Sequence, residues 1–62
     1  MRLKLSYRGC TVIVTSELAA RRWARARLGA ARLTETPTET GWQYWPARDP
    51  SGSAEPVTAV VL

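Results

Sequence analysis

The stretch Ser16-Glu-Leu-Ala-Ala-Arg-Arg-Trp-Ala-Arg-Ala-Arg-Leu-Gly29 decides the fold of this chain, because it has the clearest helical period. Ser16 is a favourable N-cap, and Glu17 in the first turn suits the positive end of the helix dipole. Gly29 suits the left-handed residue that ends many helices. The sequence therefore predicts a helix from about Glu17 to Leu28. The alternative is a helix that continues to Leu33.

This helix has two chemically different sides. On a helical wheel the alanines and Trp23 gather on one side, which Leu28 extends. Small alanines let the helix lie close to a sheet while Trp23 fills the remaining gap. Arg27 projects from this side, where stacking on the indole, snorkelling and pairing with a carboxylate are all open to it. The basic side is formed by Arg21, Arg22, Arg25 and Arg32. An end at Gly29 takes Arg32 off the strict helical line.

Two strand-like runs precede the helix. Leu3, Leu5 and Tyr7 alternate with charged and polar residues, which is typical of a half-buried strand. Arg8-Gly9 supplies a turn, because glycine readily takes positive φ. The run Cys10–Thr15 is rich in β-branched residues and is apolar on both faces. It is predicted to be a central strand, paired antiparallel with the first run.

Three further strands are predicted after the helix. Alternation resumes at 32–36, and Pro37 excludes a central strand there. In the strand Gly41–Pro46, Trp42 and Tyr44 face one way and Gln43 and Trp45 the other. Which of these two faces is buried stays open. Residues 49–56 form a turn-rich loop, and the apolar strand 57–62 must pair with the sheet or with another molecule.

Together these elements predict one α+β domain over residues 1–62. It is a small antiparallel sheet in ββαβββ order, with one helix packed on one face. A chain of 62 residues buries little surface, and small domains are often supported by disulfides, metals or oligomerisation. One cysteine and no histidine exclude an internal disulfide and a Cys/His zinc site. We therefore expect no metal and no cofactor, and either close packing around the tryptophans or a homodimer.

The formal charge is +4, and Lys4 is the only lysine among nine basic residues. No apolar run has the length of a transmembrane helix, and the N-terminus lacks the apolar core of a signal peptide. The sequence thus predicts a cytoplasmic protein with no membrane partner. Cys10 is expected to be a buried, reduced structural thiol.

The basic side of the helix is the main candidate for binding. An arginine stripe can follow a phosphate backbone, although a solvated helix face has the same pattern. Alternating basic residues of the first strand extend this candidate surface, and an exposed Trp45 would add a stacking side chain. The candidate binding residues are Arg21, Arg22, Arg25, Arg32, Arg2, Lys4 and Trp45.

An enzyme is not expected. Cys10 has no histidine in the chain to activate it, and the five carboxylates are scattered without a convincing pair. No catalytic residue is assigned for these reasons.

The layout resembles that of small phage-encoded ββαββ proteins, among them anti-CRISPR inhibitors. The matching stretches are Thr11–Ser16, Ala19–Trp23, Gly29 and Gly41–Trp45. The likeness spans most of the chain, although the 49–56 loop and the terminal strand depart from it, so no binding residue carries over. What the resemblance implies is a non-catalytic inhibitor that occludes a nucleic-acid-binding surface of a larger complex by protein–protein contact.

Two main functional hypotheses follow. The first is a small non-enzymatic interaction protein whose partner is a larger protein or ribonucleoprotein complex. The second is a basic module that binds DNA or RNA directly through the arginine side of its helix. A third reading is a structural homo-oligomer built through the last strand.

Overall fold

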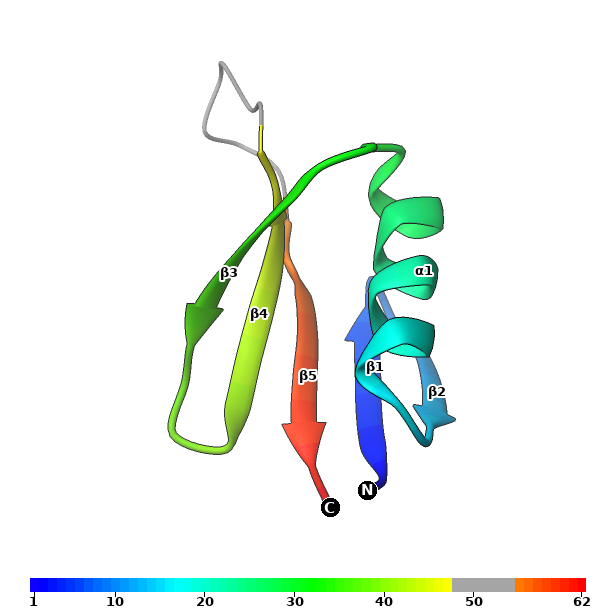
Figure 1. Cartoon of the computed structure of the whole chain (residues 1–62), viewed down its shortest axis with the longest axis vertical. Helices are drawn as coiled ribbons and strands as arrows, with labels where there is room; N and C mark the ends of the chain where they lie inside the picture. Colours follow the sequence, from blue (N-terminus) through cyan, green and yellow to red (C-terminus); the bar gives the residue numbers. More distant parts are fainter. Residues whose placement is uncertain (48–54) are drawn as a thin grey trace.

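A computed structural model describes residues 1–47 and 55–62 of the chain. It contains a five-stranded antiparallel sheet with a single helix on one of its faces (Figure 1). The elements in chain order are β1 (Leu3–Tyr7), β2 (Cys10–Val14), α1 (Glu17–Leu28), β3 (Leu33–Pro37), β4 (Gly41–Pro46) and β5 (Val57–Val61). The α+β class and the ββαβββ order are therefore confirmed. The predicted loop at 49–56 lies mostly outside the described residues.

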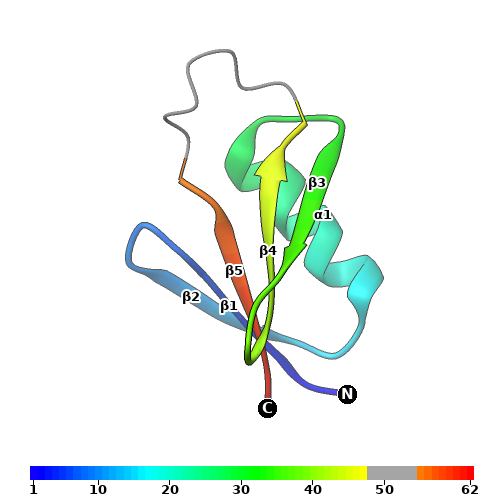
Figure 2. The same cartoon turned by 90° about the vertical axis from the view of Figure 1, so that its left-hand side faces the viewer.

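The strands are ordered β2-β1-β5-β4-β3 across the sheet. The last strand, β5, pairs with both β1 and β4, so its apolar residues are taken up by the sheet itself. An oligomer built through the edge of β5 has no free edge to use. Figure 2 shows that the sheet is twisted, with the β1–β2 hairpin crossing steeply relative to β3 and β4.

The prediction that β2 is a central strand is wrong, because β2 forms one edge of the sheet. Its β-branched residues do specify a strand, but the centre is occupied by β5. Ile13 is consequently 47% exposed. The turn before it forms as predicted: Arg8 and Gly9 have φ of 47° and 82°. Two consecutive positive φ values at a two-residue connection are the pattern of a type I′ hairpin turn.

The helix begins and ends where its capping residues predict. The Ser16 hydroxyl accepts a hydrogen bond of 3.1 Å from the backbone N–H of Ala19. Gly29 takes a left-handed conformation, with φ of 64°, and ends the helix. The alternative of a helix that continues to Leu33 is wrong, because Leu33 begins β3.

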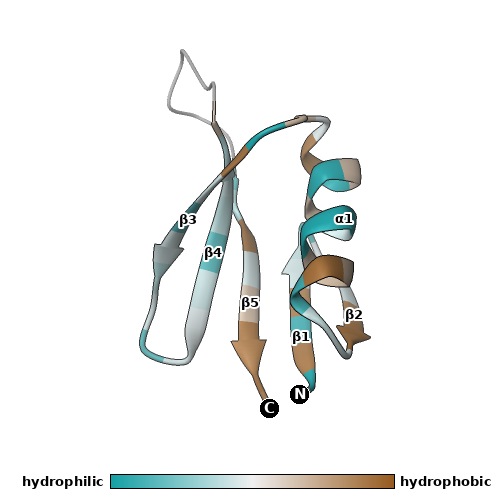
Figure 3. Cartoon of the chain, in the orientation of Figure 1, coloured by the Kyte–Doolittle hydropathy of each residue, from teal (hydrophilic) through white to brown (hydrophobic). Residues whose placement is uncertain are grey.

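The core lies between α1 and the sheet. Its fully buried residues are Leu3, Leu5, Ala20, Ala24, Tyr44, Val57 and Ala59. Figure 3 shows the apolar residues concentrated on β1, β2 and β5, whereas β3 and β4 are more polar. Trp42 and Tyr44 face the helix and meet edge to face, with ring centroids 6.3 Å apart. The predicted alternation along β4 is therefore confirmed, and its Trp42–Tyr44 face is the buried one.

Candidate functional site

A shallow groove of about 430 Å³ lies between α1 and the edge strand β3. The helix packs mainly on β4, β5, β1 and β2, which leaves β3 beyond its flank. The residues that line the groove are Arg21, Arg25, Ala31, Arg32, Leu33 and Glu35. We call this feature the arginine groove. Arg21 and Arg25 reach it because they are four positions apart and share one side of the helix.

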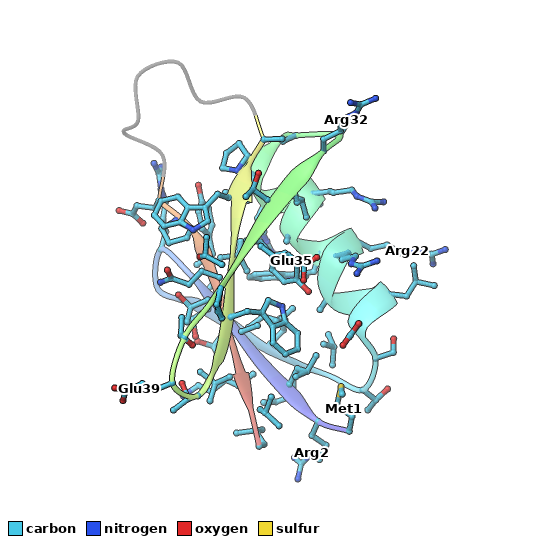
Figure 4. All side chains as sticks on the ribbon, turned by 60° about the vertical axis from the view of Figure 1, so that its left-hand side comes forward. Met1, Arg2, Arg22, Arg32, Glu35 and Glu39 are labelled. Carbon is cyan, nitrogen blue, oxygen red and sulfur yellow. The ribbon has the colours of Figure 1, made fainter. Side chains whose placement is uncertain are left out.

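Glu35 is the acidic member of the arginine groove. Its Oε2 lies 3.5 Å from Nη2 of Arg21, and both side chains are nearly half exposed. An exposed pair of this kind contributes about 0–1 kcal/mol to stability. Its main effect is to orient Arg21 toward β3. Figure 4 shows Glu35 on β3 beside α1.

Arg25 and Arg32 have no such partner. Neither forms an ion pair with any described residue, and both side chains are exposed. The groove thus carries three guanidinium groups against one carboxylate. Guanidinium groups bind carboxylates and phosphates through paired hydrogen bonds, so the arrangement favours an anionic ligand.

The remaining candidate residues lie elsewhere. Arg22 points away from the groove into solvent, and Arg2 lies near the chain ends (Figure 4). Arg32, by contrast, belongs to the groove and sits where the chain enters β3. Lys4 and Trp45 belong by register to the sheet face opposite the helix. The structure therefore brings three of the seven candidates together and distributes the other four over different surfaces.

The sheet face opposite the helix carries mainly uncharged side chains. One row across all five strands consists of Thr11, Ser6, Thr58, Gln43 and Thr36. We call this whole side of the sheet the open face, because no described residue packs over it as a second layer. The indole N–H of Trp45 donates a hydrogen bond of 3.0 Å to Oγ1 of Thr36, which fixes the ring against β3. Trp45 is thus separated by the sheet from Trp42 and Tyr44.

Tyr44 is fully buried beneath the helix, and this burial changes the pKa of its hydroxyl. Desolvation raises the pKa of Tyr44, the nearby indole N–H of Trp42 opposes the increase, and the Glu35 carboxylate adds to it. Neither Tyr44 Oη nor Trp42 Nε1 has a hydrogen-bond partner of good geometry among the described residues. Sequence reasoning missed Glu35, although period two along β3 places it on the helix-facing side, directly opposite Tyr44.

Three other side chains were singled out by the sequence. Arg27 stacks on Trp23, with its guanidinium carbon 5.0 Å from the ring centroid, so the stacking alternative is the one observed. The prediction of a buried Cys10 is wrong, since this thiol is exposed at the edge strand. The guanidinium carbon of Arg8 lies 5.5 Å from the Tyr7 ring centroid, and Nε of Arg8 lies 3.8 Å from Oε2 of Glu55.

Comparison of the chain with protein-family models, with curated proteins and with solved structures found no match. In the described part of the chain, no three His, Cys, Asp or Glu residues are grouped as a metal site would require. No described helix is both long enough and apolar enough to cross a membrane. The arginine groove and the open face are therefore the two surfaces whose chemistry can indicate a function.

Proposed function

We propose that this chain is a small non-enzymatic interaction protein that docks its arginine groove on a negatively charged surface of a larger protein or ribonucleoprotein complex. The observation that carries the proposal is the convergence of Arg21, Arg25 and Arg32 on one groove that holds a single carboxylate. Arginine suits such contacts because its planar fork is weakly hydrated and binds an anion in a defined geometry.

The separation of Trp45 from the arginine groove favours a protein partner over a bare single strand of nucleic acid. Proteins that bind single strands combine stacking aromatics with a basic path along the backbone. Here Trp45 lies on the open face, whereas the arginine groove lies on the helix side of the sheet. One strand of nucleic acid cannot use both without passing around the edge of the domain.

The resemblance to small phage-encoded proteins extends the proposal to inhibition by occlusion of a nucleic-acid-binding surface. Such surfaces are themselves basic, so they repel the arginine groove. The groove then contacts acidic side chains or RNA phosphates at the border of the surface. The weakly charged open face is free to cover the surface itself.

Affinity capture with paired charge reversals tests the proposal. The Arg25→Glu/Arg32→Glu variant removes two groove cations that have no ion-pair partner among the described residues. The Arg2→Glu/Arg22→Glu variant is the control, because it makes the same charge change outside the groove. We expect the wild type and the control to capture the same complex from a host-cell lysate, and the groove variant to lose it. RNase treatment separates a protein surface from an RNA phosphate. Equal capture by both variants would contradict the proposal.

Direct binding of DNA or RNA is the alternative, and the net charge of +4 favours it. Fluorescence anisotropy with labelled oligonucleotides at increasing salt concentration distinguishes it from the first proposal. Three phosphate contacts predict a slope of log affinity against log salt between about −2 and −3. Sub-micromolar binding with that slope, lost in Arg25→Glu/Arg32→Glu, would replace the first proposal. Absence of binding at about 0.1 M salt would exclude the alternative.

A further inference from the structure

The two edges of the sheet differ in chemistry. At one edge, β3 carries Glu35 and ends at Pro37, which has no backbone N–H to donate. At the other edge, β2 has the sequence Cys10-Thr-Val-Ile-Val14, with no charge, proline or glycine. Charged residues and prolines are the usual means by which proteins prevent edge strands from pairing. The β3 edge is therefore protected, and the β2 edge is not.

The hairpin register identifies which backbone groups β2 leaves unpaired. Tyr7 and Cys10 flank a two-residue turn, so they form a hydrogen-bonded pair. Alternation then directs the N–H and C=O groups of Cys10, Val12 and Val14 toward β1. Those of Thr11 and Ile13 point outward from the sheet. Within the described residues β2 pairs only with β1, so these outward groups have no strand partner.

We propose that β2 pairs antiparallel with β2 of a second copy of this chain, joining two five-stranded sheets into one continuous sheet across a twofold axis. The edge is complementary to itself. Symmetric pairing at Val12 places Thr11 opposite Ile13 of the partner subunit, and Ile13 opposite the partner's Thr11. The four outward backbone groups are then satisfied, and no two like charges meet.

The composition of the core explains why association with a second copy would stabilise this chain. Seven described residues are fully buried, and three of them, Ala20, Ala24 and Ala59, have the smallest apolar side chain. Ile13 is 47% exposed beside the unpaired edge. Small domains with a limited core are commonly stabilised by oligomerisation. The edge used here is at the far end of the sheet from β3 and the arginine groove, so the dimer is independent of the proposed function.

Light scattering coupled to size-exclusion chromatography tests the dimer, with a reductant present because the exposed Cys10 can form intermolecular disulfides. We expect the wild type, loaded at concentrations from micromolar to millimolar, to reach twice the 6.9 kDa chain mass. Ile13→Lys should remain monomeric, because it puts two like charges close to the twofold axis. Thr34→Lys, the same charge change on the exposed face of β3, should dimerise as the wild type does. A wild type that stays monomeric throughout, or equal loss in both variants, would overturn the proposal.

Amide hydrogen exchange on the wild type gives a second readout that does not depend on how Ile13→Lys folds. The N–H groups of Thr11 and Ile13 are unpaired in the monomer and hydrogen-bonded in the proposed dimer. Their exchange should therefore slow as protein concentration rises. The N–H groups of Val12 and Val14 bond to β1 in both states and serve as internal references. A dimer in which the Thr11 and Ile13 amides still exchange rapidly would refute the β2 interface.

Discussion

Ser16 fixes the start of the helix, since its hydroxyl accepts the N–H of Ala19 at 3.1 Å. The Ser16→Ala variant loses this bond and leaves an unsatisfied donor in the first turn. We expect the free energy of unfolding to fall by about 1 kcal/mol, as measured by urea denaturation. Thr15→Ala changes the preceding exposed hydroxyl and should stay within about 0.5 kcal/mol of the wild type. Equal losses in the two variants would argue against the cap.

Tyr44 gives the molecule a pH dependence in the alkaline range. Burial raises the pKa of its hydroxyl above the ordinary value of about 10. Above about pH 10 the unfolded state releases this proton while the folded state keeps it. The stability linked to this group is therefore complete below about pH 10 and is lost as the pH rises through the folded pKa.

Urea denaturation at about pH 8 and about pH 11 checks this dependence. Tyr44→Phe should lose less stability than the wild type between the two pH values, because it has no hydroxyl at this position to ionise. Tyr7→Phe is the control for loss of a tyrosine outside the fully buried core. It should lose stability as the wild type does. A Tyr44→Phe variant as sensitive to alkali as the wild type would show that Tyr44 is not the source.

At the scale of elements, the features encoded by neighbouring residues were predicted correctly, whereas those that depend on distant parts of the chain were not. The bounds of α1 follow from Ser16 and Gly29, and the faces of β4 follow from alternation, because both are encoded within a few residues. The place of β2 in the sheet depends on β5, more than forty residues later in the chain. The wrong predictions of a central β2 and a buried Cys10 share this cause.

The arginine groove shows the same division between local and long-range information. The helical period predicted that Arg21 and Arg25 share a side of α1, which the groove confirms. Arg32 also lies in the groove, and Arg21 pairs with Glu35. Both features depend on how β3 passes the helix. No local pattern in the sequence encodes that path. A basic helix side was therefore predictable, whereas a groove with a defined acidic member was not.

The pairing of β4 with β5 depends on Gly41. A Cβ atom at this position would collide with the carbonyl oxygen of Ala59 on the neighbouring strand. Gly41→Ala must push the two strands apart, and we expect a loss of about 3 kcal/mol in the free energy of unfolding. Gly29→Ala is the comparison. It meets no atom within 4 Å but keeps a φ of 64°, so it should cost about 1 kcal/mol. Thermal unfolding of both variants tests the order, and the reverse order would contradict the register.

At the scale of the whole molecule, residues 1–47 and 55–62 place one helix on one face of the sheet, and the two faces differ in chemistry. The helix side buries the core and carries the arginine groove at its β3 flank. The opposite face displays hydroxyls, Gln43 and Trp45. Among the described residues only one face of the sheet is covered, so the buried apolar area is small and the stability of the monomer should lie at the low end for folded domains.

This limited core makes the stability of the molecule sensitive to self-association. Only the folded chain can dimerise through β2, so the melting temperature should rise with protein concentration. We expect an increase of about 5 °C for a hundredfold change in concentration, followed by differential scanning calorimetry. Ile13→Lys should melt at one temperature regardless of concentration, while Thr34→Lys should follow the wild type. A wild-type melting temperature that is constant over this range would mean that the folded chain is stable on its own, and the β2 edge would then be free for a different partner.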